Sequence, residues 1–115
     1  MVVVTFNEPK ILDEYTIDQI GQEFDKLTLE AAADRKLLLN FAKVGFMSSS
    51  MIGKIVRLNK KCKADKIKLK LCNISPNIME VFRLTQLHKL LDIHANEADA
   101  IKAFGQSGLG WFGKR

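Results

Sequence analysis

Residues 37–55 read LLLNFAKVGFMSSSMIGKI and contain an apolar run, an apolar pair, three consecutive serines and the start of a new apolar repeat. The apolar run belongs to residues 36–43, which are short, apolar and bounded by charge, as a buried parallel strand is. After the serines an apolar residue recurs at helical spacing over roughly 50–63, at Met51, Ile55, Leu58 and Cys62. The stretch therefore predicts a strand, a hydroxyl-rich turn and a helix.

The chain before this stretch predicts another strand and another helix. Residues 2–6, VVVTF, form a β-branched run that is typical of a strand. We expect Thr16 to cap the helix, with Gln19 as the other half of a capping box. Apolar residues then follow at spacings of three and four to about Glu30 and form one buried face: Ile17, Ile20, Phe24 and Leu27.

Residues 66–73, KIKLKLCN, predict a strand of a different kind, because lysine alternates with apolar side chains. Lys66, Lys68 and Lys70 fall on one face, and we expect that no helix covers this face. Lysine on a strand also guards a sheet edge against pairing with other chains. We therefore predict that this strand lies at the edge of the sheet.

One further strand and two further helices complete the alternation. Ser75 and Pro76 predict a helix start, because serine caps and proline loses no hydrogen bond at the first helical position. Residues 89–94 predict the last strand, and we expect Gly105 to end a final helix that begins near Asn96. The side chains expected to face inward from these two helices are Ile78, Met79, Phe82, Ile101 and Phe104.

Strands that alternate with helices need crossover connections, which favour a parallel sheet. The predicted fold class is α/β: a mainly parallel four-stranded sheet, with a possible short extra strand, and about four helices packed on it. A chain of 115 residues with 47% hydrophobic and 27% charged residues suffices for one such domain, which we assign to residues 2–104. Residues 105–115 are rich in glycine, and we expect a flexible tail there.

The composition and motifs argue against several classes of protein. No apolar stretch approaches the ~20 residues of a membrane span, and no signal-peptide pattern is present, so we expect a cytoplasmic protein. Cys62 and Cys72 lack the flanking ligands of a zinc site and are expected to be reduced packing residues, and His88 and His94 form no compact metal triad. Because phosphate loops, nucleophile elbows and paired-carboxylate motifs are missing, we predict no enzymatic activity, no metal and no cofactor.

Basic residues are concentrated between positions 54 and 70, in a chain with a net charge of +5. Such a cluster is compatible with nucleic acid, anionic lipid or an acidic protein as the partner. No aromatic residue interleaves with the cluster, as a platform for single-stranded nucleic acid requires, so we favour an acidic protein partner and expect no nucleic acid. The residues are Lys54, Arg57, Lys60, Lys61, Lys63, Lys66, Lys68 and Lys70.

The three serines have two physical interpretations. A helix start leaves about four N–H groups unbonded and carries roughly half a positive charge, so one hydroxyl is explained simply as a cap. A phosphoserine at the same place adds about −1.5 to −2 charges, which the helix dipole tolerates but a partner surface laid over it does not. The turn is therefore either only a cap with a solvated loop, or a switch that changes binding without unfolding the domain.

From about residue 2 to residue 104 the sequence resembles the STAS domain of bacterial anti-sigma factor antagonists. The resemblance is carried by the strand–turn–helix stretch quoted above, by KLKLCNISPNIMEVF and LTQLHKLLDI, and by a Leu-Asp-x-x-Thr motif at Leu12, Asp13 and Thr16. The family places an apolar pair before Asp-Ser-Ser-Gly and a helix. In this chain the corresponding residues are Phe46 and Met47 for the pair, then Ser48 for the aspartate, Ser49 and Ser50 for the serines, and Met51 for the glycine.

The resemblance implies an anti-sigma factor antagonist that acts by partner switching. The unmodified protein binds an anti-sigma factor, which is a serine protein kinase, and so releases a sigma factor. Phosphorylation, expected at Ser49, ends this binding. The partner surface is expected to comprise Asp13, Ser48, Ser49, Ser50, Met51 and Lys54, with Met51 as an exposed apolar contact.

An alternative function uses the same fold without the switch. The protein is then an unphosphorylated STAS scaffold or an accessory subunit of a stress-signalling or lipid-transport assembly, and the serines only cap the helix. Monomer and weak dimer are both compatible with the sequence. The Ser49 hydroxyl distinguishes the two functions, because only the switch requires it.

Overall fold

The computed structural model describes residues 1–106, which form a parallel sheet with helices on both faces. The sheet has four strands in the order β1-β3-β5-β6, and every neighbouring pair is parallel. These strands are β1 (Val2–Thr5), β3 (Lys36–Asn40), β5 (Lys68–Cys72) and β6 (Ile93–His94). Two short strands, β2 (Lys10–Ile11) and β4 (Phe46–Met47), form a separate parallel pair.

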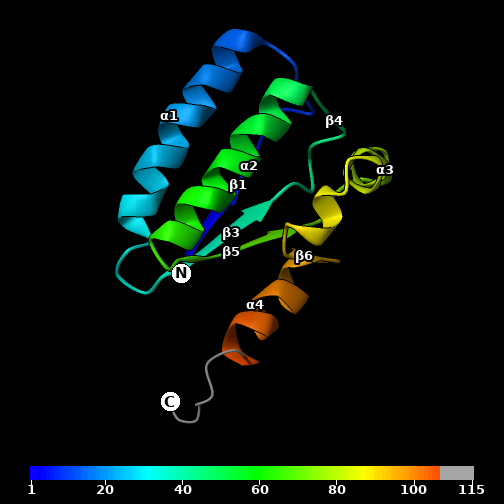
Figure 1. Ribbon diagram of the computed structural model, residues 1–115. Helices are drawn as coiled ribbons and strands as arrows, with labels where there is room; N and C mark the ends of the chain where they lie inside the picture. Colours follow the sequence, from blue (N-terminus) through cyan, green and yellow to red (C-terminus); the bar gives the residue numbers. More distant parts are fainter. Residues whose placement is uncertain (107–115) are drawn as a thin grey trace.

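Helices α1 (Glu14–Glu30) and α2 (Ser49–Ala64) lie side by side on one face of the sheet, and α4 (Glu97–Gln106) lies against the other (Figure 1). Successive side chains of a strand point to opposite faces, so β3 contributes to both layers. Leu37 and Leu39 join the main core with α1 and α2, whereas Leu38 joins Ala100 and Phe104 of α4. Helix α3 (Pro76–Leu84) and the short 3-10 helix η1 (Leu87–Lys89) connect β5 to β6.

This architecture confirms the predicted α/β fold, with four helices and a four-stranded parallel sheet over residues 1–106, and the possible extra strand is a pair of short strands, β2 and β4. The four apolar residues predicted for the buried face of α2 are all buried. Helix α3 also begins as predicted: the Ser75 hydroxyl accepts the Ile78 N–H at 3.4 Å, and Pro76 occupies the first turn. The buried face of α2 and the start of α3 were therefore predicted correctly.

The predicted start of the first helix is wrong, because Asp13 rather than Thr16 is the N-cap of α1. The Asp13 carboxylate accepts the backbone N–H of Thr16 at 2.9 Å and its hydroxyl at 3.1 Å. Aspartate is at least as good a cap as threonine, and its negative charge interacts favourably with the helix dipole. The helix therefore starts two residues before Thr16, at Glu14.

The predicted edge position of the lysine-bearing strand is also wrong, because β5 lies between β3 and β6. Lys68 is exposed at the start of β5, but Lys70 is buried under α4. Its ammonium lies 2.6 Å from a carboxylate oxygen of Asp92 and 5.0 Å from the ring centre of Phe104. A lysine that has both an ion pair and an aromatic face is compatible with a covered strand.

The C-terminal part differs from the predictions in three places. Of residues 89–94, only Ile93 and His94 form a strand, and residue 89 belongs to η1. Ile101 is exposed, and Ala100 takes the buried position beside Phe104. Helix α4 continues through Gly105 to Gln106, and the rest of the predicted tail, 107–115, lies outside the described residues. Within residues 1–106, no helix is long and apolar enough to cross a membrane.

Candidate functional site

The pairing of β2 with β4 brings the starts of α1 and α2 together. Ile11 lies opposite Met47 in this pair, and the Ser48 N–H donates to the carbonyl of Ile11 at 3.0 Å. The helix caps follow directly: Asp13, the cap of α1, lies two residues after Ile11, and Ser48, the cap of α2, lies one residue after Met47. We call this end of the molecule, formed by Asp13, Glu14 and residues 48–50, the switch end.

The three serines at the switch end have different environments. Ser48 is half-buried, and its hydroxyl accepts the Met51 N–H at 3.3 Å as the cap of α2. Ser50 is exposed and donates from its hydroxyl to a carboxylate oxygen of Glu14 at 3.1 Å, across the two helices. Ser49 is exposed at the first position of α2, and within residues 1–106 its hydroxyl has no hydrogen-bond partner. Of the three hydroxyls, only that of Ser49 is both exposed and unengaged.

Met51 is not part of this surface, so the expectation of an exposed apolar contact is wrong. Its side chain is 0% exposed and belongs to the main core with Ile17 and Ile55. The residue is the first of the buried repeat of α2, which Ile55, Leu58 and Cys62 continue. Met51 therefore contributes to core packing and not to a partner surface.

Lys54 lies one turn further along α2 from Ser50 and faces α1. Its ammonium is 3.9 Å from a carboxylate oxygen of Asp18. Its aliphatic stem passes so close to Gly21 that a Cβ added there would lie 3.2 Å from the Lys54 Cδ and Cε atoms. Lys54 thus contributes to the packing of α1 against α2 rather than to the serine turn.

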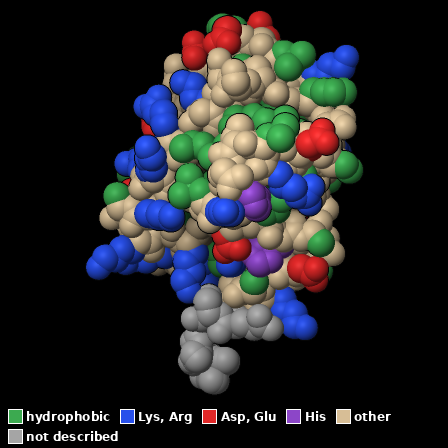
Figure 2. Space-filling view, turned by 45° about the vertical axis from the view of Figure 1, so that its right-hand side comes forward, with side chains coloured by type: hydrophobic (Ala, Val, Ile, Leu, Met, Phe, Trp, Pro, Cys, Tyr) green, Lys and Arg blue, Asp and Glu red, His purple; other side chains and the backbone are tan. Residues whose placement is uncertain are grey.

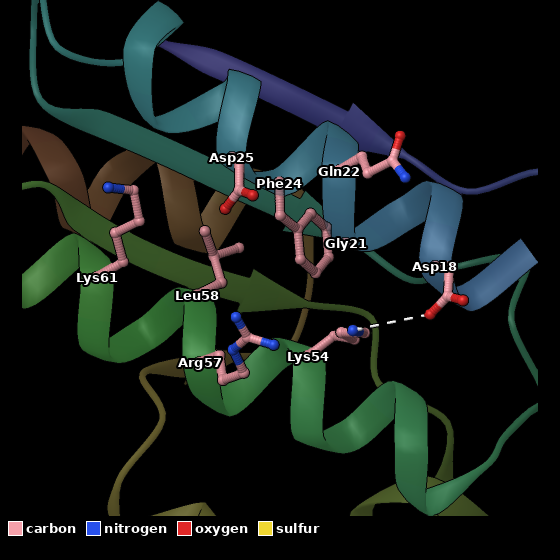
Figure 3. A pocket seen from close by; sticks show the side chains of 9 residues that line it. All are labelled: Asp18, Gly21, Gln22, Phe24, Asp25, Lys54, Arg57, Leu58 and Lys61. Carbon is pink, nitrogen blue, oxygen red and sulfur yellow. Dashed lines mark ion pairs between the residues drawn. The ribbon is translucent and has the colours of Figure 1, made fainter. Parts of the chain in front are cut away.

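A groove of about 360 Å³ runs between α1 and α2 and has this ion pair at one end (Figure 3). Lys54, Arg57 and Lys61 line it from α2, and Asp18 and Asp25 line it from α1. Phe24 and Leu58 contribute apolar surface between the two charged walls. Because the α2 wall is basic and the α1 wall is acidic, we interpret the groove as part of the contact that holds α1 against α2.

Three exposed apolar side chains near the switch end were not identified as site residues from the sequence. Leu12 is 53% exposed, Phe46 51% and Tyr15 73%. Tyr15 is out of phase with the buried repeat of α1, and this signal was available in the sequence. Clusters of exposed apolar groups among polar ones are typical of protein-binding surfaces.

The two cysteines are free thiols and both are buried. Burial raises the pKa of the Cys62 thiol to about 11, and burial also raises the pKa of the Cys72 thiol. Both are therefore protonated and poorly nucleophilic at neutral pH, as expected of packing residues. Among the described residues, no group of three His, Cys, Asp or Glu side chains is placed to hold a metal ion.

The sequence of these 115 residues also matches a known family. The model of the STAS domain matches residues 1–100. The chain belongs to the STAS domain family. Its switch end, with the three serines, directly follows the short strand pair of β2 and β4.

Solved structures of anti-sigma factor antagonists share the fold of this STAS domain. A Thermotoga maritima protein, proposed to be an anti-sigma factor antagonist, superposes with a TM-score of 0.75 at 20% identity, over 88% of this chain and 86% of that chain. An anti-sigma-factor antagonist domain protein of Planctomyces limnophilus gives 0.69 at 25% identity, over 88% and 87%. The phosphorylated form of the Bacillus cell fate determinant SpoIIAA gives 0.64 at 22% identity, over 89% and 88%.

Proposed function

We propose that this STAS domain is an anti-sigma factor antagonist whose binding to an anti-sigma factor kinase ends when Ser49 is phosphorylated. The observation that supports this proposal most strongly is the difference among the three serines. Ser48 is engaged as a cap and Ser50 is engaged with Glu14, which leaves the exposed Ser49 hydroxyl available. A kinase needs an accessible hydroxyl that can enter its active site.

The position of Ser49 is compatible with a phosphate that leaves the fold intact. Ser49 is the first residue of α2, where unbonded N–H groups and the helix dipole favour negative charge. The core side chain nearest in sequence, Met51, points away from this surface. Phosphorylation is therefore expected to change the charge of the surface while the packing of α2 is retained.

The partner surface proposed here differs from the one expected from sequence alone. It keeps Asp13 and the three serines, and it gains the exposed side chains of Leu12, Tyr15 and Phe46. It loses Met51, which is buried, and Lys54, which is engaged with α1. In a complex, the apolar side chains around the serines would be buried against the partner. A phosphate among them would oppose this burial, because a charged group is costly to remove from water.

Glu14 supplies a carboxylate close to the serines, where this chain has Ser48 in place of the family aspartate. Its oxygen accepts from Ser50 and belongs to α1 rather than to the serine turn. A negative group at this place disfavours a phosphate on Ser50 more than one on Ser49, because Ser50 contacts Glu14 directly. We therefore propose a single phosphorylation site, in a regulatory cytoplasmic protein that is not itself an enzyme.

The test is to incubate the protein with a co-encoded anti-sigma kinase and ATP and to locate the phosphate by mass spectrometry. We expect one phosphate, on Ser49, and none in Ser49→Ala. Ser50→Ala is the matched control and is expected to be phosphorylated like the parent. Absence of phosphate in the parent favours the unphosphorylated scaffold, and phosphate on Ser50 alone contradicts the proposed site.

A further inference from the structure

A second hollow, of about 350 Å³, lies beside the switch end, and we call it the lysine pocket. It is lined by Pro9 and Lys10 at β2, by residues 42–46, which lead from β3 into β4, and by Ser75. Residues 42–46 follow β3 and Ser75 follows β5, so the pocket lies beyond the carboxyl ends of these two strands. This end of a parallel sheet is where α/β domains commonly bind their ligands.

Backbone hydrogen bonds hold the walls of the lysine pocket in place. The N–H groups of Gly45 and Phe46 both donate to the Pro9 carbonyl, at 2.8 and 3.2 Å. The Val44 N–H donates to the Phe41 carbonyl at 2.9 Å, and the Val44 side chain is buried in the main core. The pocket is therefore formed before a partner binds, as is usual for binding sites.

Two lysine ammonium groups border the pocket without a counter-charge. Lys10 lies opposite Phe46 in the strand pair, and its ammonium is 5.8 Å from the centre of the Phe46 ring. Lys10 and Lys43 are both exposed, and within residues 1–106 neither has a carboxylate within 4 Å. Glu8 is exposed next to Pro9 but does not line the pocket. The two lysines thus leave a net positive charge here even when Glu8 is counted.

The helix start beside the pocket carries the opposite charge. Asp13 and Glu14 lie at the start of α1, and Figure 2 shows acidic side chains gathered at the top of the molecule, where α1 begins in Figure 1. Both acids already have partners in the fold, since Asp13 accepts from Thr16 and Glu14 accepts from Ser50. A partner that covers the serines and the pocket together therefore needs a negative group opposite the pocket.

On the basis of the function proposed above, we propose that the lysine pocket receives an aspartate or glutamate side chain of the anti-sigma kinase. Lys10 and Lys43 then fix the position of the partner over the switch end. Phe46 connects the two sites, because it lines the pocket, is 51% exposed and belongs to the proposed partner surface. Side chains that fill a pocket on the partner are typical anchors of protein interfaces.

The small number of cations favours an acidic protein over other anionic partners. Proteins that bind duplex DNA strongly make about six to ten phosphate contacts, and anionic membranes attract clusters of about four to eight Lys and Arg. The lysine pocket has two lysines, and Glu8 offsets part of their charge. Two cations beside an apolar wall suit a single carboxylate whose aliphatic part contacts Phe46.

The test is calorimetry of the full chain with the co-encoded anti-sigma kinase. The double variant Lys10→Glu/Lys43→Glu is expected to bind at least about tenfold more weakly than the parent, because like charges then face each other across the interface. Lys60→Glu/Lys102→Glu is the matched control, since it changes the net charge equally on two exposed lysines that do not line the pocket, and it is expected to bind like the parent. The affinity of the parent should also fall more steeply with salt than that of Lys10→Gln/Lys43→Gln.

Nuclear magnetic resonance of the parent gives a measurement that needs no variant. The amide signals of Gly45 and Phe46 are expected to shift when unlabelled kinase is added, and unshifted signals in the complex overturn the proposal. Equal affinities of the parent and Lys10→Glu/Lys43→Glu also overturn it, as does an equal loss in both charge-reversal variants, which indicates an effect of net charge alone. In these cases a phosphate on Ser49 still supports the proposed function. Absence of any complex between the parent and the kinase refutes both.

Discussion

Replacing Asp92 by asparagine should destabilise the domain strongly, although Asp92 itself is 51% exposed at its side chain. The reason is its partner: the Lys70 side chain is only 9% exposed, and its ammonium lies 2.6 Å from Asp92 Oδ2. The variant Asp92→Asn keeps the shape of the side chain but leaves a buried ammonium without a counter-charge. The other oxygen of Asp92 lies 2.8 Å from His94 Nε2 without hydrogen-bond geometry, so we assign the main effect to Lys70.

The expected loss follows from the burial of Lys70. Breaking a fully buried ion pair costs about 3–5 kcal/mol, and water reaches the exposed side of this one, so we expect about 2–3 kcal/mol. For a domain of this size that loss lowers the melting temperature by about 8–12 °C. Lys70→Met removes the charge and keeps contact with Phe104, and it should cost less than about 1 kcal/mol.

A double-mutant cycle measured by urea denaturation, followed by circular dichroism, checks this reasoning. In the Lys70→Met background, Asp92→Asn should cost less than about 0.5 kcal/mol. Asp18→Asn is the matched control, because Asp18 pairs with the less buried Lys54 at 3.9 Å and should contribute less than about 1 kcal/mol. An equal cost of Asp92→Asn in both backgrounds would refute the argument, as would a stability indistinguishable from that of the parent.

Three further predictions concern other parts of the molecule. Gly21→Ala should raise the free energy of unfolding by up to about 1 kcal/mol, because alanine favours the helix and the new Cβ meets only the flexible stem of Lys54. A lower free energy of unfolding, measured by urea denaturation, would show that this stem cannot move aside. Cys62 and Cys72 should not react with Ellman's reagent at pH 8 in the native protein, since burial raises both pKa values, and rapid labelling would contradict their placement in the core. The N-terminal ammonium lowers the pKa of Asp34, so the charged carboxylate stabilises the fold above its unfolded pKa, near 3.8. This stabilisation is lost as the pH falls through the lower folded pKa. Asp34→Asn should therefore reduce the acid dependence of the melting temperature, and an unchanged dependence would argue against this contact.

The parts of the fold that were predictable are those where one physical effect dominates. The repeat from Met51 to Cys62 gave the buried face of α2, because burial of one helix face outweighs every other preference there. Ser75 and Pro76 marked the start of α3, because both residues favour the same local geometry. The likeness to the STAS family depended on the same stretches, and the match over residues 1–100 confirms it.

The parts that were not predictable depend on contacts between distant residues. The position of β5 inside the sheet requires Asp92 and Phe104 to lie against Lys70, which the alternation of residues 66–73 does not indicate. Met51 was assigned two roles from the sequence, core residue and exposed contact, and its 0% exposure shows that the apolar repeat of α2 was the correct guide. The contact of Ser50 with Glu14 joins residues 36 positions apart and was likewise hidden.

The central claim, that a charge at Ser49 ends partner binding, can be tested by calorimetry with the anti-sigma kinase at one salt concentration. Ser49→Ala should bind like the parent, because the Ser49 hydroxyl has no partner within the described residues and the cap is supplied by Ser48. Ser49→Asp should bind at least about tenfold more weakly while its melting temperature stays close to that of the parent, since an acid at a helix start does not destabilise the helix. Equal affinities of the parent, Ser49→Ala and Ser49→Asp would contradict the switch and leave the serines as caps alone.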